Sequence, residues 1–318
     1  MIGHREQVRS GDAQRWTEAD VPDQSGRTVM VTGANAGIGF ETARALAGHG
    51  ARVIIAGRDL GRAEAAADSI VNAIPNADVE TVHLDLASLA SVRETAAEVR
   101  ARNGGIDVLI NNGGVMEPPY DRTVDGFELT FGTNHLGHFA LTGLLLDRLL
   151  ERPGSRIVTV SSEGHTRGVI DFEDLQSENG YKPAEAYCQS KLANLLFTYE
   201  LDRRLRVVRA HTIALACHPG IVLTSLYRTR SKFERALLDP RLRLINSRFV
   251  QSAQMGALPT LRAATDFSVQ GGEFYGPPGR GYTGYPVSVE SSARSHDEET
   301  QRRLWQESER LTGVTYSI

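Results

Sequence analysis

Cysteine and lysine are both scarce in this chain of 318 residues. Cys188 and Cys217 are the two cysteines and form no CxxC pair, which is typical of a protein in a reducing compartment. Only three of the 35 cationic residues are lysine, at Lys182, Lys191 and Lys232. Each lysine that falls within a motif is therefore worth examining.

The sequence also lacks an apolar run long enough to cross a membrane. Its densest apolar stretch is FALTGLLLDRLL at 139–150, which Asp147 and Arg148 interrupt. A membrane-spanning helix needs about 20 consecutive apolar residues. The first sixteen residues carry too many charges for the apolar core of a signal peptide. We therefore expect a soluble, cytoplasmic protein without a membrane span.

Positive charge is not in excess, because 35 Lys and Arg face 39 Asp and Glu, for a net charge of −4. A nucleic-acid-binding protein usually has a surface rich in Lys and Arg, so this chain is not expected to bind nucleic acid. No G-x-S-x-G motif is present, which argues against a Ser–His–Asp hydrolase. His135 and His138 could ligate a metal, but no HExxH or cysteine cluster supports them. We expect both to pack on a helix, and no metal site.

What the sequence does contain, from residue 27 onwards, is a regular alternation of strand-like and helix-like patterns. The strand-like runs are RTVMVTG, ARVIIAG, VETVHLDL, IDVLINN, SRIVTVSS, HTIALACHPG and GEFYGP, and the helical patterns cover 38–49, 59–73, 88–102, 126–150 and 185–206. Continuous apolar strands separated by helices indicate a parallel sheet with right-handed crossovers. The predicted fold class is α/β, a single-domain Rossmann fold whose doubly wound sheet has about seven strands and helices on both faces.

Three segments fall outside this alternation. Residues 1–25 resemble an extended N-terminal arm, and residues 221–250 form an insertion of Leu, Phe and Tyr among arginines. The tail at 286–318 opens with SHDE at 295–298, which predicts a capping box and a helix that ends at Gly313.

Three glycines lie within VTGANAGIGF at 31–40, between the first strand and the first helix. Gly33 permits a tight turn, Gly37 lets the backbone approach a ligand, and Gly39 lets the helix lie close to the strand. Backbone N–H groups at the start of the helix, together with the positive end of its dipole, suit a pyrophosphate. The spacing differs from the G-x-G-x-x-G fingerprint, so a simple tight turn remains an alternative.

The end of the second strand bears on which dinucleotide would bind. A NAD site usually places an acid there to hold the ribose 2′-hydroxyl. This sequence has Gly57 at that position, followed by Arg58 and, one helical turn later, Arg62. A guanidinium suits a 2′-phosphate. The alternative is a surface arginine in an arginine-rich chain.

Tyr187 and Lys191 are four residues apart on a predicted helix and therefore share a face. With nine tyrosines and three lysines, chance would produce this spacing in roughly one such chain in twelve. Lowering a phenol pKa from ~10 to ~7 requires about 4 kcal/mol. A positive charge about 4 Å away, at an effective dielectric of ~20, supplies that much. Such a tyrosine could exchange a proton with a carbonyl or alcohol at neutral pH.

Together these motifs resemble the short-chain dehydrogenase/reductase family from about residue 26 to 285. The matching segments are TGANAGIG, HLDL at 83–86, NNGG at 111–114, TNHLGHF at 133–139, VTVSS at 158–162, YCQSK at 187–191 and HPGIVLT at 218–224. The 25-residue interval from Ser162 to Tyr187, with AYCQSKLANLLFTYEL, most resembles the retinol dehydrogenases and their protochlorophyllide reductase and WW-domain oxidoreductase relatives.

The resemblance implies a role for individual residues. Tyr187 would be the general acid/base, and Lys191 would bind the nicotinamide ribose and tune Tyr187. Ser162 would hold the substrate oxygen, with Ser161 as the competing serine, and Asn134 would support a proton-relay water. The implied cofactor-binding residues are Gly33, Asn35, Gly37, Ile38, Gly39, Arg58, Asp85, Leu86, Asn112, Gly113, Tyr187, Lys191, Pro219, Gly220, Val222 and Thr224.

The implied function is NADP(H)-dependent interconversion of a hydrophobic aldehyde or ketone and its alcohol. NADP(H) is expected in preference to NAD(H), whose use stays open, and residues 221–250 lie where the family builds its substrate lid. Reduction of an activated C=C bond and non-catalytic sensing of a dinucleotide are the alternatives. Whether the chain forms a homo-oligomer, either a dimer or a tetramer, is left open by the sequence.

Overall fold

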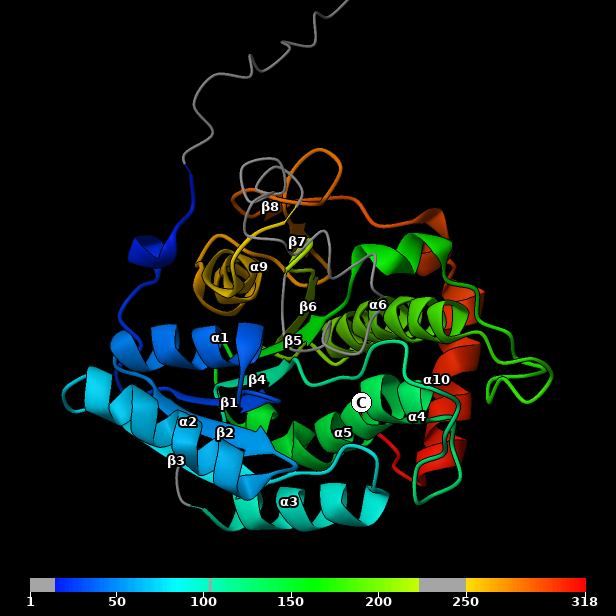
Figure 1. Ribbon diagram of the computed structural model, residues 1–318, viewed down its shortest axis with the longest axis horizontal. Coiled ribbons are helices and arrows are strands. Elements are labelled where there is room, and N and C mark those ends of the chain that lie inside the picture. The colour runs from blue at the N-terminus through cyan, green and yellow to red at the C-terminus, as the bar shows by residue number, and fades with distance from the viewer. Residues whose placement is uncertain (1–14, 103–104, 223–249) are drawn as a thin grey trace, which may run out of the picture.

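One mixed sheet forms the centre of the molecule in the computed structural model, which describes residues 15–102, 105–222 and 250–318. Within these ranges eight strands lie in the order β3-β2-β1-β4-β5-β6-β7-β8 (Figure 1). Their bounds are β1 (Thr28–Thr32), β2 (Arg52–Gly57), β3 (Asp78–His83), β4 (Val108–Asn111), β5 (Arg156–Val160), β6 (Ile213–Cys217), β7 (Phe274–Gly276) and β8 (Val287–Ser288). Strands β1 to β7 run parallel, and β8 pairs antiparallel with β7.

Helices cover both faces of this sheet. On one face lie α1 (Gly37–Gly48), α2 (Leu60–Ala73) and α9 (Ala253–Thr265). The other face carries α3 (Leu89–Ala101), α5 (Gly137–Leu150) and α6 (Pro183–Val207), with α10 (Glu298–Thr312) packed beside α6 (Figure 1). A hydrophobic core lies on each face of the sheet, and successive residues of a strand pack alternately into the two cores. Val29 and Val31 pack into one core and Met30 into the other. The predicted doubly wound Rossmann fold is confirmed.

Helix α9 and strand β8 were not predicted from the sequence. Helix α9 carries Pro259 in its interior, a residue that usually breaks a helix, and Ser252 caps its N-terminus by accepting from the Met255 N–H at 3.2 Å. Strand β8 is only two residues long. Both gain their stability from contacts with the sheet and its neighbouring helices rather than from a local pattern.

The helix predicted at 126–150 is divided into three parts. A short α4 (Leu129–Phe131) leads into a π-helical segment, η2 (Gly132–Leu136), and then into α5. The expected capping box at 295–298 is wrong, because Asp297 rather than Ser295 caps α10, accepting from the Glu299 N–H at 3.2 Å. The end of α10 is confirmed, with Gly313 left-handed at φ 62°.

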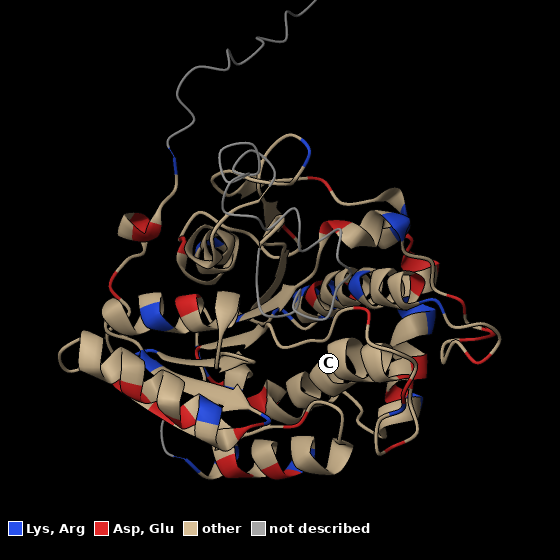
Figure 2. Cartoon of the chain, viewed as in Figure 1, with Lys and Arg blue, Asp and Glu red and all other residues tan. Residues whose placement is uncertain are grey.

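The segments expected to flank the domain are only partly described. Residues 1–14 of the arm lie outside the described residues, whereas Trp16 and Val21 in the remainder are buried in the core on the α1 face, so this part is not an extended arm. Of the lid expected at 221–250, residues 223–249 lie outside the described residues. No helix in the described ranges is both long and apolar enough to cross a bilayer. Acidic and basic residues both occur along α2, α3 and α10 (Figure 2).

Candidate functional site

The glycine-rich loop after β1 needs its glycines for two separate reasons. Gly33 and Gly37 adopt left-handed backbone angles, φ 67° and φ 60°, which favour glycine. A Cβ on Gly33 would lie 2.7 Å from Gly113 Cα, and one on Gly39 would lie 2.5 Å from Asn112 Nδ2. The loop is therefore both turned tightly and packed directly against the segment that follows β4.

Thr32 connects the glycine-rich loop with the segment after β4 through hydrogen bonds. Its Oγ1 accepts the N–H groups of Asn112 at 2.9 Å and Gly113 at 2.8 Å, while Asn112 Nδ2 donates to the Thr32 carbonyl at 2.8 Å. The carboxyl ends of β1 and β4 are thus held at a fixed separation. In open α/β sheets this edge is where ligands bind.

A cavity of about 230 Å³ opens at this edge. Its lining residues are Gly33, Asn35, Ala36, Gly37, Ile38, Gly39, Asn112, Gly113, Gly114, Val115, Met116, Val160, Ser161, Tyr187, Lys191 and Pro219. Helix α1 begins in this wall, and its N-cap residue Ala36 has no side-chain cap. Uncapped N–H groups and missing Cβ atoms fit the pyrophosphate of a dinucleotide.

Tyr187 and Lys191 reach this cavity from the second and third turns of α6. The Lys191 Nζ lies 5.7 Å from the centre of the Tyr187 ring. Lys191 is only 6% exposed and donates to the Val160 carbonyl at 3.1 Å. Burial lowers the pKa of Lys191 to about 8, so its ammonium is still charged at neutral pH. The two side chains that the Tyr–x3–Lys spacing placed on one helix face thus line the same cavity.

Ser162 follows β5 and faces a second, larger cavity of about 550 Å³, which Tyr187 also lines. The Ser162 Oγ accepts from the Gly164 N–H at 3.1 Å and can still donate its own proton. Ser161 lines the smaller cavity, but its hydroxyl donates to the Lys191 carbonyl at 2.7 Å and the residue is 2% exposed. Of the two serines, Ser162 is the one that shares the larger cavity with Tyr187.

Asn134 lies in the π-helical segment η2 and forms hydrogen bonds with the loop after β4. Its Oδ1 accepts from the Val115 N–H at 2.8 Å, and its Nδ2 donates to the Val115 carbonyl at 2.9 Å and to Ser190 Oγ at 3.0 Å. A Cβ on Gly114 would lie 2.8 Å from Asn134 Oδ1. The amide therefore positions backbone around the site, and π-helical turns of this kind often mark functional sites.

His138 connects Asn134 with the glycine-rich loop, a link that the sequence analysis missed. Its Nδ1 lies 3.0 Å from the Asn134 carbonyl and its Nε2 lies 2.9 Å from Thr32 Oγ1. Because a carbonyl only accepts, Nδ1 carries the proton and Nε2 accepts from the threonine hydroxyl. Burial lowers the pKa of His138 to about 4, which keeps the ring neutral. His135 instead bonds Ser308 Oγ at 2.8 Å.

The remaining expected cofactor residues lie farther along the same edge. Arg58, Asp85 and Leu86 follow β2 and β3 and line neither cavity. The larger cavity is lined by Pro219, Gly220 and Val222, of which Pro219 also lines the smaller one, and Thr224 lies outside the described residues.

Comparison with known proteins decides the family. A sequence model of the family described as short chain dehydrogenase matches residues 27–235. The chain belongs to the short-chain dehydrogenase family. It is an oxidoreductase that acts on CH–OH groups, and the family binds a nicotinamide dinucleotide. The resemblance drawn from the motifs is thereby confirmed.

Among its relatives are retinol dehydrogenases. Retinol dehydrogenase 13 of Homo sapiens is 44% identical over 94% of this chain and 87% of its own length, and retinol dehydrogenase 12 of Homo sapiens is 43% identical over 92% and 88%. A crystal structure of an uncharacterised protein from Mycobacterium paratuberculosis is 44% identical, with a TM-score of 0.79 over 96% of this chain and 100% of that one. The Pseudomonas aeruginosa RhlG/NADP active-site complex is 25% identical, with a TM-score of 0.61 over 79% and 94%.

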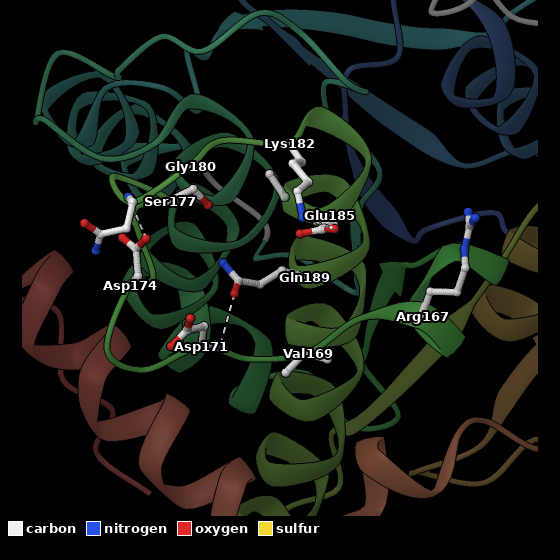
Figure 3. A pocket seen from close by; sticks show the side chains of 11 residues that line it. Arg167, Val169, Asp171, Asp174, Ser177, Gly180, Lys182, Glu185 and Gln189 are labelled. Atoms are coloured by element: carbon white, nitrogen blue, oxygen red, sulfur yellow. Dashed lines mark hydrogen bonds and ion pairs between the residues drawn. The ribbon is translucent and has the colours of Figure 1, made fainter.

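This short-chain dehydrogenase has another hollow, of about 520 Å³, lined by the segment that precedes α6 and by the first two turns of α6. Figure 3 shows that several of its polar side chains face one another, whereas Arg167 extends away from them. Gln189 accepts from the Asp171 N–H at 3.1 Å, Asp174 accepts from Glu178 N–H at 2.7 Å, and Lys182 pairs with Glu185 at 2.9 Å. Neither Tyr187 nor Ser162 lines it, so the chemistry belongs to the other two cavities.

The His138 link leads to a first prediction. His138→Phe removes the imidazole partner of the buried Asn134 carbonyl and leaves the Thr32 hydroxyl only the more distant Ile110 carbonyl, at 3.3 Å, as an acceptor, so it is expected to lower stability by about 1–3 kcal/mol. Thr32 also connects the glycine-rich loop with the segment after β4. The Kd for NADPH, measured by fluorescence titration, is therefore expected to rise about tenfold.

His135→Phe is the matched control for this prediction, because it removes an equally buried imidazole that bonds Ser308 instead of the loop. It is expected to lower stability and leave the NADPH Kd unchanged. Equal effects of the two substitutions on the Kd would show that His138 does not position the loop.

Proposed function

We propose that this enzyme interconverts a hydrophobic aldehyde or ketone and its alcohol with NADP(H), and that Tyr187 is its general acid/base. The observation that carries this proposal is the place of Tyr187, which lines both the glycine-walled cavity and the larger cavity beside it. A proton donor at that border touches both a bound nicotinamide and a substrate. Retinol dehydrogenases among the relatives support an apolar substrate.

The residues present fit a nicotinamide dinucleotide, which when bound supplies or accepts the hydride. The N-terminus of α1 and the loop from Gly33 to Gly39 would hold the pyrophosphate. Lys191, whose ammonium is buried at the floor of the smaller cavity, would hold the nicotinamide ribose. These contacts orient the cofactor toward Tyr187.

The chain's own part in the reaction is the movement of one proton. In the direction of reduction, Tyr187 Oη gives its proton to the carbonyl oxygen as negative charge develops there. The Lys191 ammonium stabilises the phenolate that remains, and Ser162 Oγ donates a hydrogen bond to the same substrate oxygen. In the direction of oxidation, the phenolate takes the hydroxyl proton back.

The cofactor preference is the second prediction. Arg58 is exposed and makes no ion pair within the described ranges, so its guanidinium is available for a 2′-phosphate. A Cβ on Gly57 would lie 3.7 Å from the Ala63 Cβ, an ordinary contact, so the position has room for a Cβ. Wild type is expected to prefer NADPH over NADH about 10- to 150-fold in kcat/KM, and Gly57→Asp with Arg58→Ala to reverse this preference.

Arg62→Ala provides the control, because Arg62 already pairs with Asp59 at 3.2 Å. It is expected to change the cofactor ratio by less than about threefold. A wild type that uses NADH as well as NADPH would rule out the NADP(H) assignment, whatever the variants do.

The activity itself is tested with a panel of aldehydes, ketones, retinoids and enones, assayed with NADPH under initial-rate conditions. Turnover of carbonyl compounds supports the proposal. Turnover confined to the C=C bond of enones would replace it with the alternative reaction, and a protein that binds NADPH but turns over no compound of the panel would count against an enzyme of this type.

A further inference from the structure

The larger cavity has two chemically different walls. One wall is apolar and is formed by Ile38, Met116, Pro219, Ile221, Val222 and Tyr282. The other is the 3₁₀ segment η3 (Glu163–Arg167) directly after Ser162, which presents Glu163, Thr166 and Arg167. A wholly apolar substrate would remove water from the charged groups of this second wall and would offer them no hydrogen bonds in return, which costs free energy.

Arg167 is the cation of the polar wall, and it has no acidic partner within the described ranges. Three acids line a hollow together with Arg167, and each has another partner: Glu185 pairs with Lys182 at 2.9 Å, Asp171 accepts from the Glu173 N–H at 3.1 Å and Asp174 from the Glu178 N–H at 2.7 Å. Figure 3 shows the Arg167 side chain extending away from Asp171 and Glu185. Its guanidinium is therefore not used by the fold in the way that most of the protein's arginines are.

Arg167 lines both the larger cavity and the hollow beside α6 that Figure 3 shows. Its guanidinium lies beside the Cys188 thiol and acts to lower the pKa of that thiol, against the larger effect of burial, which raises it. A Cβ on Gly164 would lie 3.5 Å from both Cys188 Sγ and Ser162 Oγ and 3.4 Å from Tyr187 Cε1. Cys188 and the two catalytic side chains thus surround one small glycine, and Arg167 borders the same space.

The cavity also carries two acids, Glu163 and Glu117, and Arg167 forms an ion pair with neither of them within the described ranges. Glu163 Oε2 lies 3.8 Å from His218 Nε2, on the side of Gly281, where a Cβ would lie 2.6 Å from the same oxygen. Burial raises the pKa of Glu163, which makes its charge easier to lose. Glu117 has an interaction of its own, and its charge raises the pKa of the Cys188 thiol, opposite to the effect of Arg167. The guanidinium is therefore left to pair with a single anionic group on a ligand.

We propose that Arg167 binds a carboxylate of the substrate, so that the preferred substrates are carbonyl compounds or alcohols with an apolar body and one carboxylate. The apolar wall takes the body, Ser162 and Tyr187 take the reacting oxygen, and the planar guanidinium takes the carboxylate through paired N–H donors. This inference rests on the proposed function, because it takes the larger cavity as the substrate site.

The test uses the full chain and pairs of compounds that differ only in charge: straight-chain aldehydes of increasing length that end in a carboxylate, and their methyl esters. Wild type is expected to prefer the best acid over its ester by about 10- to 100-fold in kcat/KM with NADPH. Arg167→Met is expected to bring this acid-to-ester ratio close to one, and Arg167→Lys to give an intermediate ratio.

Arg122→Met is the matched control, since it removes an equal charge from an arginine that lines none of these cavities and pairs with Glu178. It is expected to leave the ratio unchanged. Calorimetry with the hydroxy acid and hydroxy ester products in the presence of NADP⁺ should show the same preference in Kd, also lost in Arg167→Met.

A wild-type ratio near one, or a ratio that survives in Arg167→Met, would overturn the carboxylate site while leaving the carbonyl reductase intact. Failure of wild type to reduce any aldehyde, acid or ester, would instead overturn the proposed function, and the inference with it. The two failures are therefore distinguishable in one set of assays.

Discussion

Tyr187→Phe is expected to lower turnover about 10²–10⁴-fold, the usual contribution of a positioned general acid. The substitution removes only the hydroxyl, and the ring still fills the border between the two cavities. The Kd for NADPH should therefore change little. Stopped-flow measurement of the hydride-transfer step, with a carbonyl substrate that wild type reduces, isolates this effect from product release.

Tyr199→Phe is the control on the same helix. Tyr199 lies three turns farther along α6, and its hydroxyl bonds Ser291 Oγ at 2.7 Å. Removing it is expected to lower stability by about 1 kcal/mol and to leave turnover unchanged. Wild-type turnover in Tyr187→Phe would show that the proton reaches the substrate by another route.

The features that the sequence predicted well are those set by local spacing. Tyr187 and Lys191 share a helix face because four residues make about one turn, and no tertiary contact is needed to know this. The alternation of buried strands and helices likewise gives a parallel sheet. The positions of Gly33 and Gly39 followed from the same logic, and both are now seen packed against the segment after β4.

The features that were missed depend on contacts between distant parts of the chain. His138 is 106 residues from Thr32, and its two hydrogen bonds have no sequence signature. Helix α9 was not predicted because Pro259 disfavours a helix at that position. The helix is stabilised by its packing against α1 and the sheet rather than by a strong local pattern. The π-helical turn at Asn134 is of the same kind, because hydrogen bonds to Val115 and Ser190 accompany it.

Lys191→Met is expected to abolish most of the activity and yet to stabilise the protein without cofactor. The wild-type ammonium is buried, and its pKa falls from 10.5 to about 8, a shift that corresponds to about 3 kcal/mol of instability at neutral pH. Methionine fills similar space without a charge. The Val160 carbonyl keeps a donor, because Asn194 Nδ2 also bonds it at 3.2 Å.

The pH dependence distinguishes this explanation from a general packing effect. Between pH 8 and 10.5 the unfolded chain binds the Lys191 proton and the folded chain does not, so the stability of wild type gains from rising pH. The stability advantage of Lys191→Met, measured by urea unfolding, is therefore expected to be largest below pH 8 and to shrink toward pH 10.5. Lys182→Met, which removes an exposed lysine paired with Glu185, is expected to show no such advantage.

A Lys191→Met protein that is less stable than wild type at every pH would contradict the assignment of a costly buried charge. If the advantage is found, the fold bears this cost because the charge is needed by the reaction. A charged group next to Tyr187 stabilises the phenolate, and removing it is expected to lower kcat/KM by at least about 10²-fold. Stability and activity would then move in opposite directions at one residue, as expected where a site is organised for catalysis rather than for folding.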